Sequence, residues 1–194
     1  MLKKYSGNPV LSKKDVPYDS QLVFNAGITK FQGKYVMAFR NDYGSDQQVW
    51  IEHFKKYPDY PPVKGIPFPP LYTNIGLAFS DDGINWQVRE KPCFEMKSET
   101  MTHAYDPRLT VIDGRVYMCF AVNTPWGVRG GIAVTDDFDD FEFLTMTVPH
   151  NRNMVLFPEK INGKYYRLDR PFQNTTGTIW MMESPDLIHW GRPR

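Results

Sequence analysis

The sequence predicts an all-β fold of the β-propeller type, and three observations support this prediction. An apolar-rich hairpin phrase occurs three times, over residues 28–40, 109–121 and 157–170. A second phrase, in which an apolar strand runs into an Asp-containing turn and then an aromatic residue, follows each hairpin. Each unit therefore holds about four strands. Units of this size that recur along a chain are typical of propeller blades.

The hairpin phrase is predicted from its turn residues. Its two apolar-rich runs meet at Gln32-Gly33, Asp113-Gly114 and Asn162-Gly163. Such pairs reach turn conformations with positive φ at little cost, and they are a strong short-range signal for a β-hairpin.

The second phrase occupies residues 75–86, 131–141 and 179–190. Its Asp residues resemble a calcium loop, but their place directly after a strand predicts turns instead. Trp86, Trp180 and Trp190 close or enter these phrases, and we expect them to pack between blades.

Spacing between the units reveals an insertion. The turn glycines Gly33, Gly114 and Gly163 lie 81 and 49 residues apart, and the longer first unit contains an insertion at residues 43–74. The insertion is rich in proline: Pro58, Pro61, Pro62, Pro67, Pro69 and Pro70. A Pro-rich stretch cannot join a central ladder, so it predicts an ordered surface loop or lid. No periodic segment of convincing length predicts a helix.

The chain is predicted to be a single domain, residues 1–194, with blades at about 20–95, 100–148 and 149–194. Residues 8–11 are a candidate strand for ring closure. Three blades do not close a ring, which takes four to eight. The chain is therefore a fragment of a longer protein, a truncated product with exposed edge strands, or a unit that associates with further copies to cover them. We favour truncation.

Composition narrows the class of protein. The 41% hydrophobic and 23% charged residues describe an ordinary soluble domain, and 15% aromatic residues suit a β-rich protein that handles sugars. A net charge of +1 gives no electrostatic case for nucleic-acid or membrane binding. Residues 1–5 lack the apolar stretch of a signal peptide, so a cytoplasmic location is expected. In that compartment Cys93 and Cys119 are expected to be free thiols without a role. The four histidines form no ligand motif, and no metal site is expected.

Candidate site residues follow from the repeat. In a blade, the residue before the first strand and the residue that ends the second strand lie at the same rim of the central channel. This geometry gathers eight residues at one mouth: Asn25, Arg40, Tyr105, Asp106, Asn123, Arg152, Asn153 and Arg170. In the loop beyond Asn123, Trp126 is a candidate for stacking on a sugar ring.

One acid among several arginines indicates phosphorolysis. Hydrolysis of a glycoside ordinarily uses two carboxylates. If phosphate attacks the sugar, the second carboxylate is unnecessary and cationic groups must hold the attacking anion, a task that suits the planar guanidinium fork. Taken singly, Arg40 and Arg170 better fit surface arginines at strand ends, and Asp106 before Pro107 better fits a turn residue. Their equivalent placement in the repeat favours the functional interpretation.

Several motifs then resemble glycoside hydrolase family 130, whose members are inverting β-mannoside phosphorylases built on a five-bladed β-propeller. The resemblance covers nearly the whole chain. It is carried by Val-Phe-Asn-Ala-Gly at 23–27, Phe-Arg-Asn-Asp at 39–42, Tyr-Asp-Pro-Arg at 105–108, residues 151–153 and 155–161, Arg-Pro at 170–171 and residues 184–190. The residues at 23–27 and at 129–133 are similar to those of the family branch that acts on 4-O-β-D-mannosyl-D-glucose.

The resemblance implies a role for each matched position. Asp106 would be the general acid and would deliver its proton through the mannose 3-hydroxyl. Arg152 and Arg170 match phosphate-binding arginines, while Asn25, Arg40 and Tyr105 fall where the family holds the mannosyl residue, with Asn123 and Asn153 beside them. The products would be α-mannose 1-phosphate and an acceptor sugar. Inorganic phosphate is a co-substrate, and no cofactor or metal is implied.

Two other functions stay open from the sequence alone. A hydrolase of the same architecture would need a second acid opposite Asp106, for which Glu159, within a predicted strand, and Glu183, at a predicted blade edge, are the candidates. A non-catalytic glycan-binding module is the alternative from a different class, because the chain is predicted to be truncated.

Overall fold

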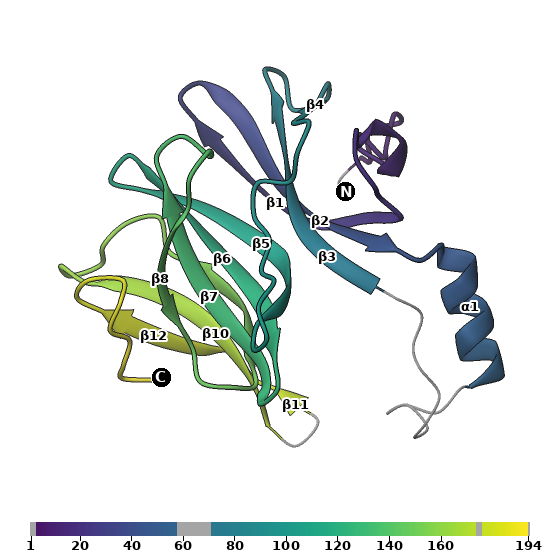
Figure 1. Cartoon of the computed structure of the whole chain (residues 1–194). Coiled ribbons are helices and arrows are strands. Elements are labelled where there is room, and N and C mark those ends of the chain that lie inside the picture. Colours follow the sequence, from purple (N-terminus) through teal and green to yellow (C-terminus); the bar gives the residue numbers. More distant parts are fainter. Residues whose placement is uncertain (1–2, 58–70, 174–175, 194) are drawn as a thin grey trace.

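The computed structural model describes residues 3–57, 71–173 and 176–193. It is mostly β, and its strands form three antiparallel sheets of four strands each (Figure 1). The elements in chain order are the short 3-10 helix η1 (Lys13–Asp15), β1 (Leu22–Phe31), β2 (Lys34–Gly44), α1 (Gln47–Lys56), β3 (Leu71–Ser80), β4 (Gln87–Val88), β5 (Thr102–Ile112), β6 (Arg115–Thr124), β7 (Gly127–Thr135), β8 (Glu142–Met146), β9 (Asn151–Leu156), β10 (Tyr165–Gln173), β11 (Thr176–Gly177) and β12 (Trp180–Ser184).

The three sheets follow one another across the molecule in chain order (Figure 1). Sheet 1 contains β1 to β4 and sheet 2 contains β5 to β8, each in sequence order. In sheet 3, β9 and β12 flank β10, and the short β11 also pairs with β10. The first strands adjoin, with β1 against β5 and β5 against β9. Side chains on these strands can therefore meet across the sheets.

Apolar cores fill the two interfaces between sheets. Val36 and Leu77 of sheet 1 pack with Met118 and Phe120 of sheet 2, and the centres of the Phe94 and Phe120 rings lie 4.7 Å apart. A second cluster joins sheets 2 and 3, and it includes Ile132 of sheet 2 and Met154 and Leu156 of sheet 3. Burial of this apolar surface fixes the sheets relative to one another.

A third cluster covers the other face of sheet 1. Met37 and Phe39 of β2 pack there against Val10, Leu11 and Val16 of the N-terminal segment. The candidate strand at residues 8–11 is wrong, because these residues form coil and a bend that cover the sheet instead of pairing with its edge.

The predicted hairpin turns are confirmed by their backbone angles. In all three, both central residues have positive φ: Gln32 48° and Gly33 83°, Asp113 50° and Gly114 78°, Asn162 51° and Gly163 76°. Two successive positive φ values match the right-handed twist of the flanking strands.

The Asp-containing phrases are also turns, as predicted. In each, the hydroxyl of Ser80, Thr135 or Ser184 accepts bonds from backbone N–H groups two and three residues on. The carboxylates of Asp82, Asp137 and Asp186 likewise accept hydrogen bonds from the backbone N–H groups two and three residues after each Asp. These donated hydrogen bonds hold the pKa of each carboxyl below its usual range.

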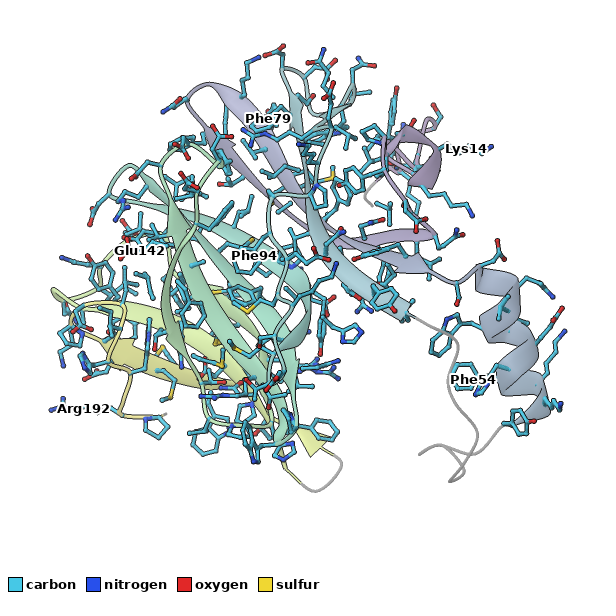
Figure 2. The ribbon with its side chains drawn as sticks, viewed as in Figure 1. Lys14, Phe54, Phe79, Phe94, Glu142 and Arg192 are labelled. Carbon is cyan, nitrogen blue, oxygen red and sulfur yellow. The ribbon has the colours of Figure 1, made fainter. Side chains whose placement is uncertain are left out.

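The insertion at 43–74 differs from its prediction. It contains α1, whose first turn is capped by a 2.7 Å hydrogen bond from the backbone N–H of Gln48 to Asp46. Residues 71–74 belong to β3, and the Pro-rich part, 58–70, lies outside the described residues. The helix, with Phe54 on it, stands apart from the sheets (Figure 2). No described helix is long and apolar enough to cross a membrane.

Both cysteines are free thiols, as expected. Burial raises the pKa of Cys93 and of Cys119 to about 12, so neither is a reactive thiolate.

Candidate active site

Three β-bulges place the candidate residues. The register shifts between Phe24 and Gly27 in sheet 1, between Tyr105 and Arg108 in sheet 2, and opposite Leu168–Arg170 in sheet 3. At each shift stands a residue with positive φ: Asn25 at 49°, Asp106 at 54° and Asn153 at 60°. Asn and Asp tolerate this conformation better than most residues, and a bulge redirects its side chain. The prediction placed these residues before the first strands, whereas they lie within β1, β5 and β9.

Asp106 lies where sheet 1 meets sheet 2. Its Oδ1 accepts a 2.9 Å hydrogen bond from Nδ2 of Asn25 and lies 3.5 Å from a terminal nitrogen of Arg40. Its side chain is only 11% exposed. Sequence reasoning brought these three residues together, and the structure does so by direct contacts.

Arg40 is held on several sides. Its Nε and Nη2 donate to the two carboxylate oxygens of Asp42 at 2.7 and 2.8 Å. Its guanidinium carbon lies 4.5 Å from the centre of the Phe24 ring and 4.8 Å from that of Tyr105. Burial lowers the pKa of Arg40, but the contacts with Asp42 and then Asp106 outweigh it, so that the net shift is upward.

Tyr105 connects the acid to sheet 3. It is buried, and its hydroxyl donates a 3.0 Å hydrogen bond to Oδ1 of Asn123. Burial raises the pKa of Tyr105, while a hydrogen bond and the positive charge of Arg152, together with the charge of Arg40, oppose that rise. Asn123 and Arg152 therefore both reach the hydroxyl end of this ring.

Sheet 3 supplies a pair of arginines. Arg152 of β9 and Arg170 of β10 are direct cross-strand partners. The backbone N–H of Arg170 donates to Oδ1 of Asn151 at 3.1 Å. Nearby, Oδ1 of Asn153 is buried and has no hydrogen-bond partner in the described part of the chain. Like charges placed directly opposite each other destabilise a sheet unless an anion joins them.

The two alternative acids lie outside this cluster. Glu159 falls in a bend between β9 and β10, so its placement within a strand was wrong. Glu183 lies on the edge strand β12, as predicted, and is 2.6 Å from Lys164 and 3.3 Å from Arg192. Trp126 is 64% exposed in the turn after β6, beyond Asn123, and its stacking role stays a prediction.

Sequence reasoning missed Asp42 and Thr73. Asp42 is buried against Arg40, and the Thr73 hydroxyl donates to its Oδ1 at 2.9 Å. Alternation along a strand was the available signal, because Arg40 and Asp42 are two residues apart and share a face of β2. Thr73 pairs with Asp42 across β2 and β3, a register that the insertion hides in the sequence.

A mostly shielded carboxylate beside amides, aromatic rings and guanidinium groups, at the junction of antiparallel sheets, forms a candidate active site for a polar ligand such as a sugar. The family model described as beta-1,4-mannooligosaccharide phosphorylase matches residues 71–194. The chain belongs to glycoside hydrolase family 130.

Known relatives agree with this assignment. A beta-1,4-mannooligosaccharide phosphorylase of Ruminococcus albus is 28% identical over 205 residues, which cover 98% of this chain and 53% of the relative. A 4-O-beta-D-mannosyl-D-glucose phosphorylase of Bacteroides fragilis is 31% identical over 163 residues, covering 76% of this chain and 35% of the relative. The structure of a beta-1,2-mannobiose phosphorylase from Listeria innocua with beta-1,2-mannobiose superposes with a TM-score of 0.80 at 26% identity, covering 98% of this chain and 64% of that one. The chain thus spans about half the length of the curated relatives it matches.

Proposed function

We propose that this chain carries the acid side and part of the phosphate side of a β-mannoside phosphorylase, a transferase-type enzyme. Its reaction moves a β-linked mannosyl residue to inorganic phosphate with inversion. The preferred substrate in this proposal is 4-O-β-D-mannosyl-D-glucose, with glucose as the leaving sugar.

One observation carries the choice of phosphorolysis over hydrolysis. Asp106 faces the cluster with its carboxylate, whereas the second carboxylate there, Asp42, has both oxygens bound to Arg40 and one also to Thr73. A hydrolase needs a second carboxylate free to activate water or to attack the sugar. Asp42 is committed to other partners, so it is poorly suited to that task.

The proposed step uses Asp106 as the acid. Its proton passes, through the mannose 3-hydroxyl, to the glycosidic oxygen as the bond from that oxygen to the anomeric carbon breaks. A phosphate oxygen attacks the same carbon from the opposite face and forms the new bond. Asp106 is left as a carboxylate, and the site regains a proton from solvent before the next turnover.

The arginine pair supports a place for phosphate. Arg152 and Arg170 are cross-strand partners on β9 and β10, and a phosphate dianion held between their side chains would balance both charges with charge-assisted hydrogen bonds. Asn25, Arg40, Tyr105, Asn123 and Asn153 then surround the mannosyl residue in this proposal.

We also propose that the three sheets are blades of a propeller with the predicted boundaries. The adjoining first strands and the shared turns support this interpretation. A cytoplasmic location and assembly with further copies remain predictions.

A direct test separates the candidate functions. The protein is incubated with mannosylglucose, β-1,4-mannobiose and β-1,2-mannobiose, each with and without inorganic phosphate, and mannose 1-phosphate is measured. Phosphate-dependent mannose 1-phosphate from mannosylglucose above the other two supports the proposal. Free mannose released without phosphate would point to a hydrolase. Binding of the sugar without any product would point to a glycan-binding module.

A further inference from the structure

We propose that Asp42 is a positioning residue that holds Arg40 so that only one guanidinium nitrogen faces Asp106. The effect on turnover rests on the function proposed above, whereas the effect on Arg40 does not. Asp42 itself touches neither Asp106 nor, in this proposal, the substrate.

The contacts of Asp42 fix the guanidinium plane. Its two carboxylate oxygens accept hydrogen bonds from Nε and Nη2 of Arg40, at 2.7 and 2.8 Å, and so form a bidentate pair. The Asp42 side chain is 3% exposed and Thr73, on the neighbouring strand, donates to it at 2.9 Å. The Asp42 carboxylate is buried and hydrogen-bonded to both Arg40 and Thr73, so it has little freedom to move with Arg40 if the Arg40 side chain rotates.

Two aromatic rings restrict the remaining motion. Phe24 and Tyr105 lie 4.5 and 4.8 Å from the guanidinium carbon, so the group lies against rings from two different sheets. With Nε and Nη2 on Asp42, Nη1 is the nitrogen that reaches Oδ1 of Asp106, at 3.5 Å. This distance is beyond an ordinary hydrogen bond. Arg40 therefore stays close to Asp106 without forming a short hydrogen bond to its carboxylate.

The charges around Asp106 explain why this matters. Asn25 of β1 donates to it, Arg40 approaches from β2, and Arg152 of β9 lies beyond the Tyr105 hydroxyl. Arg108, on the strand of Asp106, donates to the carbonyl groups of Asn25 and Pro107. Asp42 is the acidic partner of Arg40 in this group. Without it, Arg40 would have Asp106 as its nearest carboxylate and would close onto it, which would occupy the acid needed by the sugar.

A second Arg-x-Asp pair serves as an internal comparison. Arg167 and Asp169 of β10 have the same spacing, an Nε–Oδ1 distance of 2.7 Å and side chains 5% exposed. Arg167 lies over the Trp190 ring, and Asp169 accepts from Asn151. Among the described contacts, this pair makes none with Asp106. It is therefore a comparison pair with the same spacing and similar burial that does not contact the proposed acid.

The test follows two readouts in the variants D42N and D42E. The first is the arginine Nε–H signals in a ¹⁵N–¹H spectrum, which report arginines bound to carboxylates without any need for turnover. We expect the Arg40 signal to shift or disappear in D42N and to return in part in D42E, while the Arg167 signal stays in place. An Arg40 signal that is unchanged in D42N would overturn the proposal, whatever the reaction of the protein proves to be.

The second readout is kcat and KM for phosphorolysis. A misplacement of about 1 Å in a catalytic group is able to cost about 100-fold in rate, so we expect kcat to fall by about that factor in D42N with a small change in the KM of phosphate. D136N is the control for a bidentate pair away from the site, because Asp136, directly after β7, binds Arg115 at 2.7 and 3.0 Å on the exposed surface. A D42N enzyme with wild-type kcat would refute the positioning role. If D42N does not fold, T73V removes one hydrogen bond to Asp42 and should lower kcat by about 2- to 12-fold. An unchanged kcat in T73V would equally refute the positioning role.

Discussion

The two sides of the candidate site differ in how their polar groups are satisfied. On the acid side, formed by Asn25, Arg40, Asp42 and Asp106, every member has a partner within the protein at 3.5 Å or less. On the cation side, formed by Arg152, Asn153 and Arg170, the two arginines are cross-strand partners, and Oδ1 of Asn153 is buried without a hydrogen bond from any described residue.

This difference suggests a division of work. Groups that must hold a proton donor in one orientation are tied together before any ligand arrives, which limits the cost of reorganisation during the reaction. On the cation side, two cross-strand arginines bring together positive charges that an anion would balance, and the buried Oδ1 of Asn153, an acceptor, is left for a hydroxyl group of the sugar. Variants on each side of the site, together with a control far from it, test this contrast.

Replacement of Asp106 by Asn should have the largest effect. The amide cannot act as the acid, and loss of a general acid typically costs 10²- to 10⁴-fold, so we expect kcat to fall by about 100- to 10,000-fold. The measurement is the initial rate of mannose 1-phosphate formation, with the circular dichroism spectrum as the control for folding. A D106N enzyme with more than a tenth of wild-type activity would remove Asp106 from the acid role.

Replacement of Arg152 or Arg170 by Ala should act on the cation side. Each hydrogen bond to a charged group contributes about 1.5–3 kcal/mol, which corresponds to a rise of roughly 10- to 150-fold in the KM of phosphate. The KM of the sugar should change much less for R170A than for R152A, because Arg152 also contacts Tyr105. Arg115→Ala, on an exposed pair, is the control. An unchanged phosphate KM in both variants would contradict the division into two sides.

Phosphate alone should stabilise the protein. A ligand at 100 times its Kd adds about 2.7 kcal/mol to the free energy of unfolding, which for a domain of this size raises the Tm by roughly 5–11 °C. Sulfate and phosphate titrations followed by thermal unfolding measure this, and the rise should be lost in R152A/R170A and kept in D106N. An equal rise in all three would mean that the anion binds elsewhere.

The smallest effect is expected at the distal hairpins. Gly114 and Gly163 have φ of 78° and 76°, and no described atom lies within 4 Å of the place that an alanine Cβ would take, so alanine there is strained but not blocked. We expect G114A and G163A to lower the free energy of unfolding by about 1 kcal/mol each in chemical denaturation, with kcat unchanged. A change in kcat larger than twofold would show that the two sides of the site depend on the outer turns.

Local features of the fold were predictable from the sequence. The three Gly-containing turns and the Asp turns are decided within four or five residues, by positive φ and by side-chain bonds to nearby N–H groups. The contact between Asn25 and Asp106, and the like position of Asn153 in sheet 3, followed from their equivalent places in the repeat. Their bulges did not, because a bulge depends on how two strands share register.

Other features depend on contacts that the sequence does not display. The apolar residues of α1 include the consecutive run 49–51, which obscures a helical period, although Asp46 carried a capping signal. The N-terminal segment covers a face of sheet 1 through Val10 and Leu11, a packing choice with no local signature. Strand alternation could have predicted the bond between Arg40 and Asp42. Its role could not be predicted, because it depends on the position of Asp106 on the neighbouring sheet.

A single measurement tests the central claim, that Asp106 and the arginine pair act together on a β-mannoside and phosphate. ³¹P NMR of the protein with mannosylglucose and inorganic phosphate follows the phosphorus of the co-substrate directly. We expect a growing signal of α-mannose 1-phosphate that is absent in D106N and much slower in R170A at limiting phosphate. Mannose released while the phosphate signal stays constant would contradict it.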